Sequence, residues 1–401
     1  MSLIFFPCRS LSVNTRHSFG TDNGVCEVTD QLTSNTNGGK LTVTGTTTST
    51  ATSVTVNATN TAQRYGDATF AATNFPFLTS YTAIAADHYG RHSSNAVTVS
   101  IATNTTYQYD GDGNLLYDGL RSFVYDNENQ LLQVCVTNQW LSQFAYDGKM
   151  RRRTRLEFTW QNGAWLQTNA VYYVYDGNVV IQERNINNLP TTTYTRGLDL
   201  SSSLDGAGGI GGLLSMTLNT ALGPASSNSM YYHSDANGNV TMLLNPWQYI
   251  VAKYLYDAFG NTLSTAGTLA QQNLYRFSSK EAHFNSGLVY YLYRYYDPNL
   301  QRWPNRDPLG EFPDGPNLYA FASNDSIDRV DLDGRMIPPN FHPPGSGYPG
   351  KCGFSEWLRC AWACAKQCRI ATSCSVEYMP GPSLLKVTEI ITCKCSNPWP
   401  F

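Results

Sequence analysis

Cysteine is the residue type whose number and spacing in this chain most clearly could do chemistry. Ten cysteines occur, and seven crowd the last 50 residues: Cys352, Cys360, Cys364, Cys368, Cys374, Cys393 and Cys395. Such density in a short segment is typical of disulfides formed outside a reducing cytosol. Zinc is the alternative, but the spacing matches no finger or ribbon pattern. The pattern favours a disulfide-bonded tail, in which an odd count leaves one thiol unpaired or paired elsewhere.

Two other motifs resemble ligand sites. Asp110-Gly-Asp-Gly-Asn114 offers alternate oxygen ligands like the start of a calcium loop, but Arg121 stands where the bidentate Glu of such a loop belongs, so a turn is favoured. The Gly-rich run 205–212 resembles a phosphate loop, but no Lys-Ser or Lys-Thr follows it. We interpret that run as a flexible crossing between strands.

Histidines are too scattered to suggest a metal site. Only His88 and His92 lie close together, across a predicted turn; the others are His17, His233, His283 and His342. No Gly-x-Ser-x-Gly elbow lies between a strand and a helix. We therefore expect neither a metal nor a cofactor.

Charge and hydropathy exclude two classes of partner. The net charge is −3 and only 14% of residues are charged, so no basic surface is expected to attract nucleic acid. No apolar run approaches the roughly 18 residues that span a bilayer. The first residues lack the features of a signal peptide, so we expect that export information lies elsewhere or that the chain is a fragment.

The elements that must position any site are predicted to be strands. Tyr, Phe, Trp and Thr are abundant, and 32 glycines can supply turns. After an N-terminal segment (1–27), residues 28–103 alternate with period two at 41–45, 54–56, 79–85 and 95–101, which predicts a small β-sandwich. Tyr65-Gly-Asp-Ala-Thr-Phe70 and Asp87-His-Tyr-Gly-Arg91 make this part resemble the Ig-like modules of bacterial surface proteins.

Residues 107–274 carry a degenerate repeat built on Tyr-Asp. Its copies include Tyr109-Asp110, Tyr125-Asp126, Tyr146-Asp147, Tyr175-Asp176 and Tyr256-Asp257. A strand ends in Tyr, the Asp side chain caps a tight turn, and Gly or Asn accepts positive φ. Each hairpin cannot bury its own face, so the units are expected to stack into one sheet.

These units resemble the YD repeats of the Rhs, teneurin and insecticidal toxin-complex families. Residues 275–334, the core module below, match the Rhs repeat-associated core in six ordered blocks: Tyr275-Arg-Phe277, 287–298, Arg302-Trp303, 306–310, 317–321 and 330–334. The resemblance implies a sheet wound into a hollow shell. About 230 residues give only part of one, so we expect an upstream YD-repeat shell partner or a missing N-terminal portion.

The resemblance also implies an aspartyl-type autoprotease, with Asp307 and Asp331 as the acid pair and Arg294 as their basic partner. Two close carboxylates share one proton, so one can deprotonate water while the other protonates the peptide. The cleaved peptide bond would follow Gly334 or Arg335, and the position after Arg335 is favoured. The chain departs from the family at 324–326 and at Arg335, where Leu is usual.

A structural role is the alternative for each of these residues. Asp307 and Asp331 lie in turn sequences, as does Asp297. Arg294 could stack among Tyr293, Tyr295 and Tyr296 through cation–π contacts alone.

The remaining residues form a Pro/Gly linker (335–350) and a cysteine-rich tail (351–401). Ser355 to Arg369 is predicted as a helix with Cys360, Cys364 and Cys368 on one face, and Lys386 to Cys395 as a strand. Acids and histidines are scarce in this tail, which argues against an enzyme toxin.

Together the sequence predicts an all-β protein: an Ig-like β-sandwich, a YD-repeat shell segment ending in the core module, and a small cysteine-rich α/β tail. The favoured function is a secreted or cell-surface scaffold that encloses or presents its C-terminal peptide. The first alternative is a self-cleaving polymorphic toxin that releases residues 336–401. The second is an adhesin that binds a carbohydrate or another surface receptor through exposed tyrosines.

Overall fold

A computed structural model describes most of the chain: residues 2–7, 31–36, 41–47, 51–66, 68–76, 78, 80–98, 104–219, 228–310, 317–327, 329–335, 370–380 and 387–396. Strands dominate these residues, and no α-helix occurs among them. The prediction of an all-β protein is confirmed for the described part. The predicted helix at Ser355 to Arg369 lies outside it.

The N-terminal part contains two four-stranded antiparallel sheets that share one core. The first has the order β1 (Ser2–Pro7), β3 (Leu41–Thr46), β7 (Thr69–Phe75) and β6 (Gln63–Arg64); the second has β5 (Asn60–Thr61), β4 (Ser53–Val56), β8 (Ser80–Ala86) and β9 (His92–Thr98). Val43 and Phe70 of one sheet pack with Val54 and Tyr81 of the other. Alternate residues of β4 and β8 fill this core, as the period-two pattern predicts.

Two short segments cross the boundaries that the sequence suggested. Ser2–Pro7 pairs with β3, so part of the expected N-terminal segment belongs to the first sheet. Ser34–Thr36 (β2), expected inside the sandwich, pairs with β10 (Asn104–Thr106), and the neighbouring Leu32 packs in the core of the following domain.

A single antiparallel sheet of 14 strands follows, the YD sheet below, in which each strand pairs with its neighbours in sequence. Its strands are β11 (Gln108–Tyr109), β12 (Leu115–Tyr117), β13 (Ser122–Tyr125), β14 (Leu131–Val136), β15 (Trp140–Tyr146), β16 (Arg152–Gln161), β17 (Ala164–Asp176), β18 (Val179–Arg184), β19 (Pro190–Arg196), β20 (Leu213–Leu218), β21 (Ser229–Ser234), β22 (Val240–Leu244), β23 (Ile250–Tyr256) and β24 (Thr262–Ala266). The stacked hairpins predicted from the repeat are confirmed.

Asp side chains hold the turns of several repeats, among them Asp110, Asp126, Asp147 and Asp257. At Asp257, Oδ1 accepts the backbone N–H groups of Phe259 and Asn261, both at 2.9 Å, and Oδ2 accepts the side-chain amide of Asn261 at 2.8 Å. The Tyr256 hydroxyl donates to the Val240 carbonyl, one hairpin back, at 2.8 Å. The Asp closes the turn while the Tyr ties neighbouring hairpins together.

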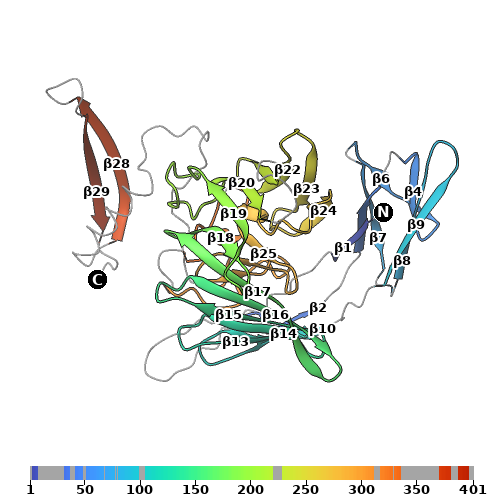
Figure 1. Ribbon diagram of the computed structural model, residues 1–401, viewed down its shortest axis with the longest axis horizontal. Helices are drawn as coiled ribbons and strands as arrows, with labels where there is room; N and C mark the ends of the chain where they lie inside the picture. The colour runs from blue at the N-terminus through green and yellow to red at the C-terminus, as the bar shows by residue number, and fades with distance from the viewer. Residues whose placement is uncertain are drawn as a thin grey trace.

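The core module packs against the YD sheet, which curves round it (Figure 1). It contains η2 (Phe277–Ser279), β25 (Glu281–His283), β26 (Leu288–Tyr290), β27 (Tyr295–Tyr296) and η3 (Ala322–Asn324). Leu288 and Tyr295 of the module share a core with Phe123 and Phe144 of the sheet. The module and the YD sheet therefore share one interior.

The tail contributes a hairpin of β28 (Ile370–Pro380) and β29 (Val387–Ser396), and only the second strand was predicted. Cys374 lies opposite Cys393 in the register of this pair. The other candidate disulfide residues before β28 lie outside the described residues. None of the helices in the described part is both long and apolar enough to span a membrane.

Candidate functional site

The side chain of Arg294 connects the residues that the family resemblance singled out. Its Nη2 donates to Asp307 Oδ2 at 2.6 Å and lies 3.9 Å from Asp331 Oδ2. Its Nε donates to the Gly334 carbonyl, one residue before Arg335. Asp307, Asp331 and Arg294, called the acid site below, are therefore gathered beside the predicted cleavage segment.

Each carboxylate of the acid site serves two purposes. Asp307 Oδ1 accepts the Leu309 N–H at 2.9 Å, and Asp331 Oδ1 accepts the Gly334 N–H at 2.7 Å. The other oxygen of each carboxylate faces Arg294. The turn interpretation is thus correct for both residues, and it is compatible with the acid-pair interpretation.

Burial separates Asp331 from an ordinary aspartate. Its side chain is 2% exposed, and loss of water raises its pKa to about 7, although the nearby Arg294 guanidinium lowers it. Asp331 can therefore hold a proton at neutral pH. Asp307 accepts a short hydrogen bond from Arg294, so the two carboxylates lie in different electrostatic surroundings.

Arg294 and Asp297 each contact residues that the sequence did not indicate. Arg294 stacks on Trp303, with 4.2 Å between its guanidinium carbon and the ring centroid. Asp297 is outside the acid site: its Oδ1 accepts the N–H groups of a turn and its Oδ2 pairs with Arg121 of the YD sheet. The turn interpretation of Asp297 is confirmed.

Arg335 ends the described part of the module in a fixed position. Its guanidinium lies 3.5 Å from the Tyr293 ring centroid and pairs with Asp333 at 2.7 Å. Backbone pairing adds to this, because Tyr293 N–H donates to the Asp333 carbonyl at 3.1 Å. The segment from Asp331 to Arg335 is held beside the acid site by both side-chain and backbone contacts.

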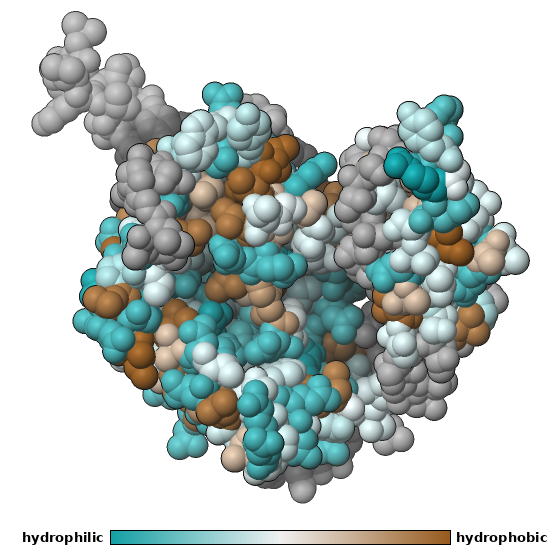
Figure 2. All heavy atoms as spheres, turned by 45° about the vertical axis from the view of Figure 1, so that its right-hand side comes forward, coloured by the Kyte–Doolittle hydropathy of each residue, from teal (hydrophilic) through white to brown (hydrophobic). Residues whose placement is uncertain are grey.

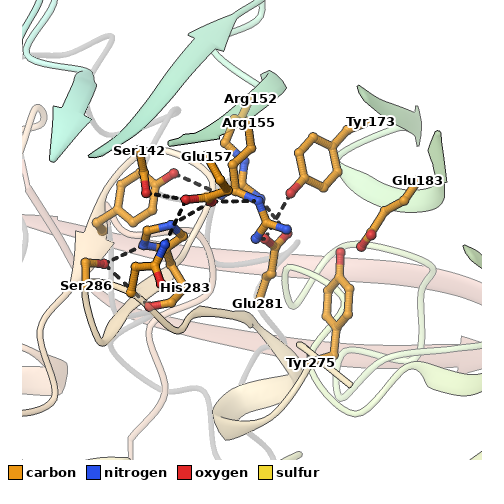
Figure 3. Close-up of polar contacts among 12 residues, drawn as sticks. Ser142, Arg152, Arg155, Glu157, Tyr173, Glu183, Tyr275, Glu281, His283 and Ser286 are labelled. Carbon is orange, nitrogen blue, oxygen red and sulfur yellow. Dashed lines mark hydrogen bonds and ion pairs between the residues drawn. The ribbon is translucent and has the colours of Figure 1, made fainter. Parts of the chain in front are cut away.

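A second polar cluster, which the sequence did not reveal, joins the module to the YD sheet (Figure 3). Glu281 of β25 pairs with Arg152 and, at 2.8 Å, with Arg155, both on β16. The Tyr173 hydroxyl of β17 also donates to Glu281 at 3.0 Å. All four side chains are buried, so these ion pairs fix the module against the sheet.

Next to this cluster, His283 lies between Glu157 and Ser286 in an arrangement that superficially resembles a catalytic triad (Figure 3). Its Nε2 is 3.0 Å from Glu157 Oε1 and its Nδ1 is 2.6 Å from Ser286 Oγ. The Ser286 hydroxyl is buried and accepts the Leu288 N–H, so it is part of a turn. Burial lowers the pKa of His283. This group is an interior contact and not a nucleophile site.

The other sequence candidates have structural partners. Asp110 accepts the backbone and side-chain N–H groups of Asn114, as the other repeat turns do. His88 and His92 lie at a turn and on β9, and no cluster of metal-binding side chains occurs among the residues described. The Gly-rich run forms a series of turns in which Ala207 and Ile210 are buried.

The sheet of Tyr-Asp hairpins closed by a core module places the chain in the class of YD-repeat proteins. Comparison with curated proteins agrees: over part of its length the chain is homologous to the Rhs/YD-repeat family. It is 29% identical over 269 residues to the tRNA3(Ser)-specific nuclease WapA of Bacillus spizizenii, covering 64% of this chain and 10% of that protein. It is 36% identical over 92 residues to toxin subunit YenC2 of Yersinia entomophaga, covering 22% of this chain and 9% of that protein.

Comparison with solved structures finds toxin-complex proteins, at lower sequence identity. A TcdB2–TccC3 crystal structure is 17% identical with a TM-score of 0.46, covering 73% of this chain and 15% of the other. The Photorhabdus luminescens Tc holotoxin pore gives 17% identity and a TM-score of 0.47, covering 75% and 15%. No protein-family model matches the chain. The chain thus spans about a tenth of the curated relatives named above.

Proposed function

We propose that this chain is the scaffold portion of a secreted or cell-surface YD-repeat protein, and that its core module cuts the chain once, after Arg335. The carrying observation is that Arg294 contacts Asp307 and the Gly334 carbonyl while lying close to Asp331. The YD sheet supports the scaffold role because it encloses the module that holds this segment. An upstream YD-repeat portion, on this or another chain, would complete the shell.

The acid site supplies the chemistry for one hydrolysis. Asp307, ionised beside Arg294, removes a proton from water, whose oxygen attacks the Arg335 carbonyl carbon. Asp331, whose pKa burial raises to about 7, donates its proton to the departing nitrogen of Met336. The carbon–nitrogen bond breaks, leaving a carboxylate on Arg335 and an amine on Met336.

Single substitutions test these roles. Asp307→Asn removes the base and Asp331→Asn removes the proton donor, so each is expected to slow the cut by at least about a hundredfold. N-terminal sequencing of the smaller product is expected to begin at Met336. Asp325→Asn is the control, because Asp325 is a half-exposed carboxylate of the same module that pairs with Arg329. Equal cutting in all four proteins would rule out the acid site.

The tyrosines of the repeats do not support the adhesin alternative. Tyr109, Tyr125, Tyr146, Tyr175 and Tyr256 pack against the interior clusters, so their rings are not presented to a sugar. Figure 2 shows apolar residues on the visible face in separate patches among hydrophilic ones. Exposed aromatics such as Trp247 and Tyr249 lie in the turn between β22 and β23.

A further inference from the structure

Lys280 is a buried cation that takes no part in the proposed acid-site chemistry. It connects the Gly-rich run with the segment that follows Asp331. It lies between η2 and β25 and is 7% exposed. Its Nζ donates to the Gly208 carbonyl and to the Leu332 carbonyl, both at 2.7 Å. Leu332 directly follows Asp331, so this ammonium group holds the backbone of the segment that enters the acid site.

The Gly-rich run is itself fixed, and can therefore serve as an anchor for Lys280. Asp199 Oδ2 accepts the N–H groups of Ala207 at 2.6 Å and Gly209 at 3.1 Å. The Gly211 N–H donates to Ser279 Oγ at 3.0 Å. These bonds leave the Gly208 carbonyl in place to accept from Lys280.

Gly208 must be glycine for the two segments to approach as they do. Its φ is +62°, and a Cβ there would lie 1.8 Å from the Leu332 carbonyl oxygen. A methyl group at this distance displaces the backbone, since neither atom is on a flexible side chain. The missing side chain at 208 therefore sets how closely the cleavage segment lies against the run.

The space beside this contact is open. A cavity of about 310 Å³ is lined by Lys280, Asp205, Asp333 and Arg335, among others. Burial lowers the pKa of Lys280 to about 8, although the negative charges of Asp333 and Asp331 raise it. Burying an ammonium group costs free energy unless the group is hydrogen-bonded or paired with a charge.

We propose that Lys280 and Gly208 form a clamp that positions the Leu332 carbonyl, and thereby holds Gly334 and Arg335 against the acid site. This inference rests on the proposed self-cleavage and adds positioning residues that lie outside the acid pair. Lys280 also supplies positive charge near Asp331, which favours the ionised carboxylate.

Two variants and a matched control test the clamp by hydrogen exchange. Gly208→Ala and Lys280→Met are compared with Gly163→Ala, where φ is +81° and nothing lies within 4 Å of a new Cβ. All three are made in the Asp307→Asn chain, so that the segment stays uncut. Amide exchange of residues 330–335 is expected to be at least about tenfold faster in the two clamp variants and unchanged in the control. Equal exchange in all three would overturn the clamp, whether or not the chain cuts itself.

Self-cleavage of the same variants with Asp307 restored distinguishes positioning from packing. Both clamp variants are expected to cut at least about tenfold more slowly than Gly163→Ala. Loss of the Lys280 charge raises the pKa of Asp331, so the midpoint of the rate against pH should rise in Lys280→Met and stay in Gly208→Ala. If the midpoint of the rate against pH does not move in Lys280→Met, the charge of Lys280 does not act on Asp331 and Lys280 only packs. If the parent does not cut, the proposed function fails and hydrogen exchange alone decides the clamp.

Discussion

Asp331 and Asp307 each divide their two oxygens between a turn and Arg294. Six sequence blocks were enough to name these three residues, because each block is a local pattern. The sequence could not show that Asp331 is buried, since its burial comes from segments distant in the chain. Lys280 was missed for the same reason: nothing near it in sequence indicates that it bonds Gly208 and Leu332.

Self-cleavage should depend on pH through Asp331. Because its pKa is about 7 and its protonated form is the proton donor, the rate is expected to be level below about pH 6 and half-maximal near pH 7. Above pH 7 it should fall about tenfold per unit as Asp331 ionises. The rate is measured after a jump from high pH, following the fragment that begins at Met336. A rate that rises from pH 7 to 9 would contradict the assignment of Asp331 as the acid.

Glu281 should be the most sensitive buried charge of the module. Glu281→Gln leaves the guanidinium groups of Arg152 and Arg155 without their carboxylate, so the free energy of unfolding is expected to fall by about 3–5 kcal/mol. Arg153→Gln is the control, because Arg153 is exposed on β16, the strand of Arg152 and Arg155. It should change the free energy of unfolding by less than about 0.5 kcal/mol. Denaturant titration measures both. A loss in Glu281→Gln as small as the one expected of the control would show that the cluster contributes little.

At the scale of elements, the repeat predicted most of the YD sheet because its turn is a local device. The structure also contains turns with Asn in the place of Asp. Asn185 and Asn245 each accept the backbone N–H groups of the residues two and four positions later, as Asp257 does. A search for Tyr-Asp pairs misses these turns, although the Asn amide oxygen can accept the same hydrogen bonds as an Asp carboxylate. The pairing of β1 with β3 and of β2 with β10 has no local signal, because the partners lie far along the chain.

The repeat turn predicts a difference between two substitutions at one position. Asp257→Ala leaves the N–H groups of Phe259 and Asn261 without their acceptor, and is expected to lower the free energy of unfolding by about 1–2 kcal/mol. Asp257→Asn keeps an acceptor oxygen, as the native Asn turns do, and should lose less than half as much. Thermal or denaturant unfolding compares them. Equal losses would mean that charge, and not the turn bonds, matters at Asp257.

At the scale of the whole molecule, the module and the YD sheet are joined by contacts that no local pattern announces. Arg152 and Glu281 are separated by 129 residues in sequence. The clusters around Phe144 and Tyr295, and around Tyr173 and Tyr275, likewise join sheet to module. The YD sheet and the module therefore share their interior across long distances in sequence.

This shared interior predicts that sheet and module unfold together. Amide exchange of β14–β18 and of β25–β27 is expected to become fast at the same denaturant concentration, because neither part retains its core alone. Hydrogen exchange with mass spectrometry at rising denaturant measures both regions in one sample. Exchange of the module while the sheet stays protected would show that the module is a separate unit.

The intact mass of the purified chain, beside an Asp307→Asn, Asp331→Asn double variant, tests the function most directly. The wild type is expected to yield a fragment that ends at Arg335 and a second that begins at Met336, while the double variant keeps the mass of the full chain. A wild type that stays whole under conditions where Asp331 is protonated would contradict self-cleavage. Asp307 and Asp331 would then be turn residues of a scaffold.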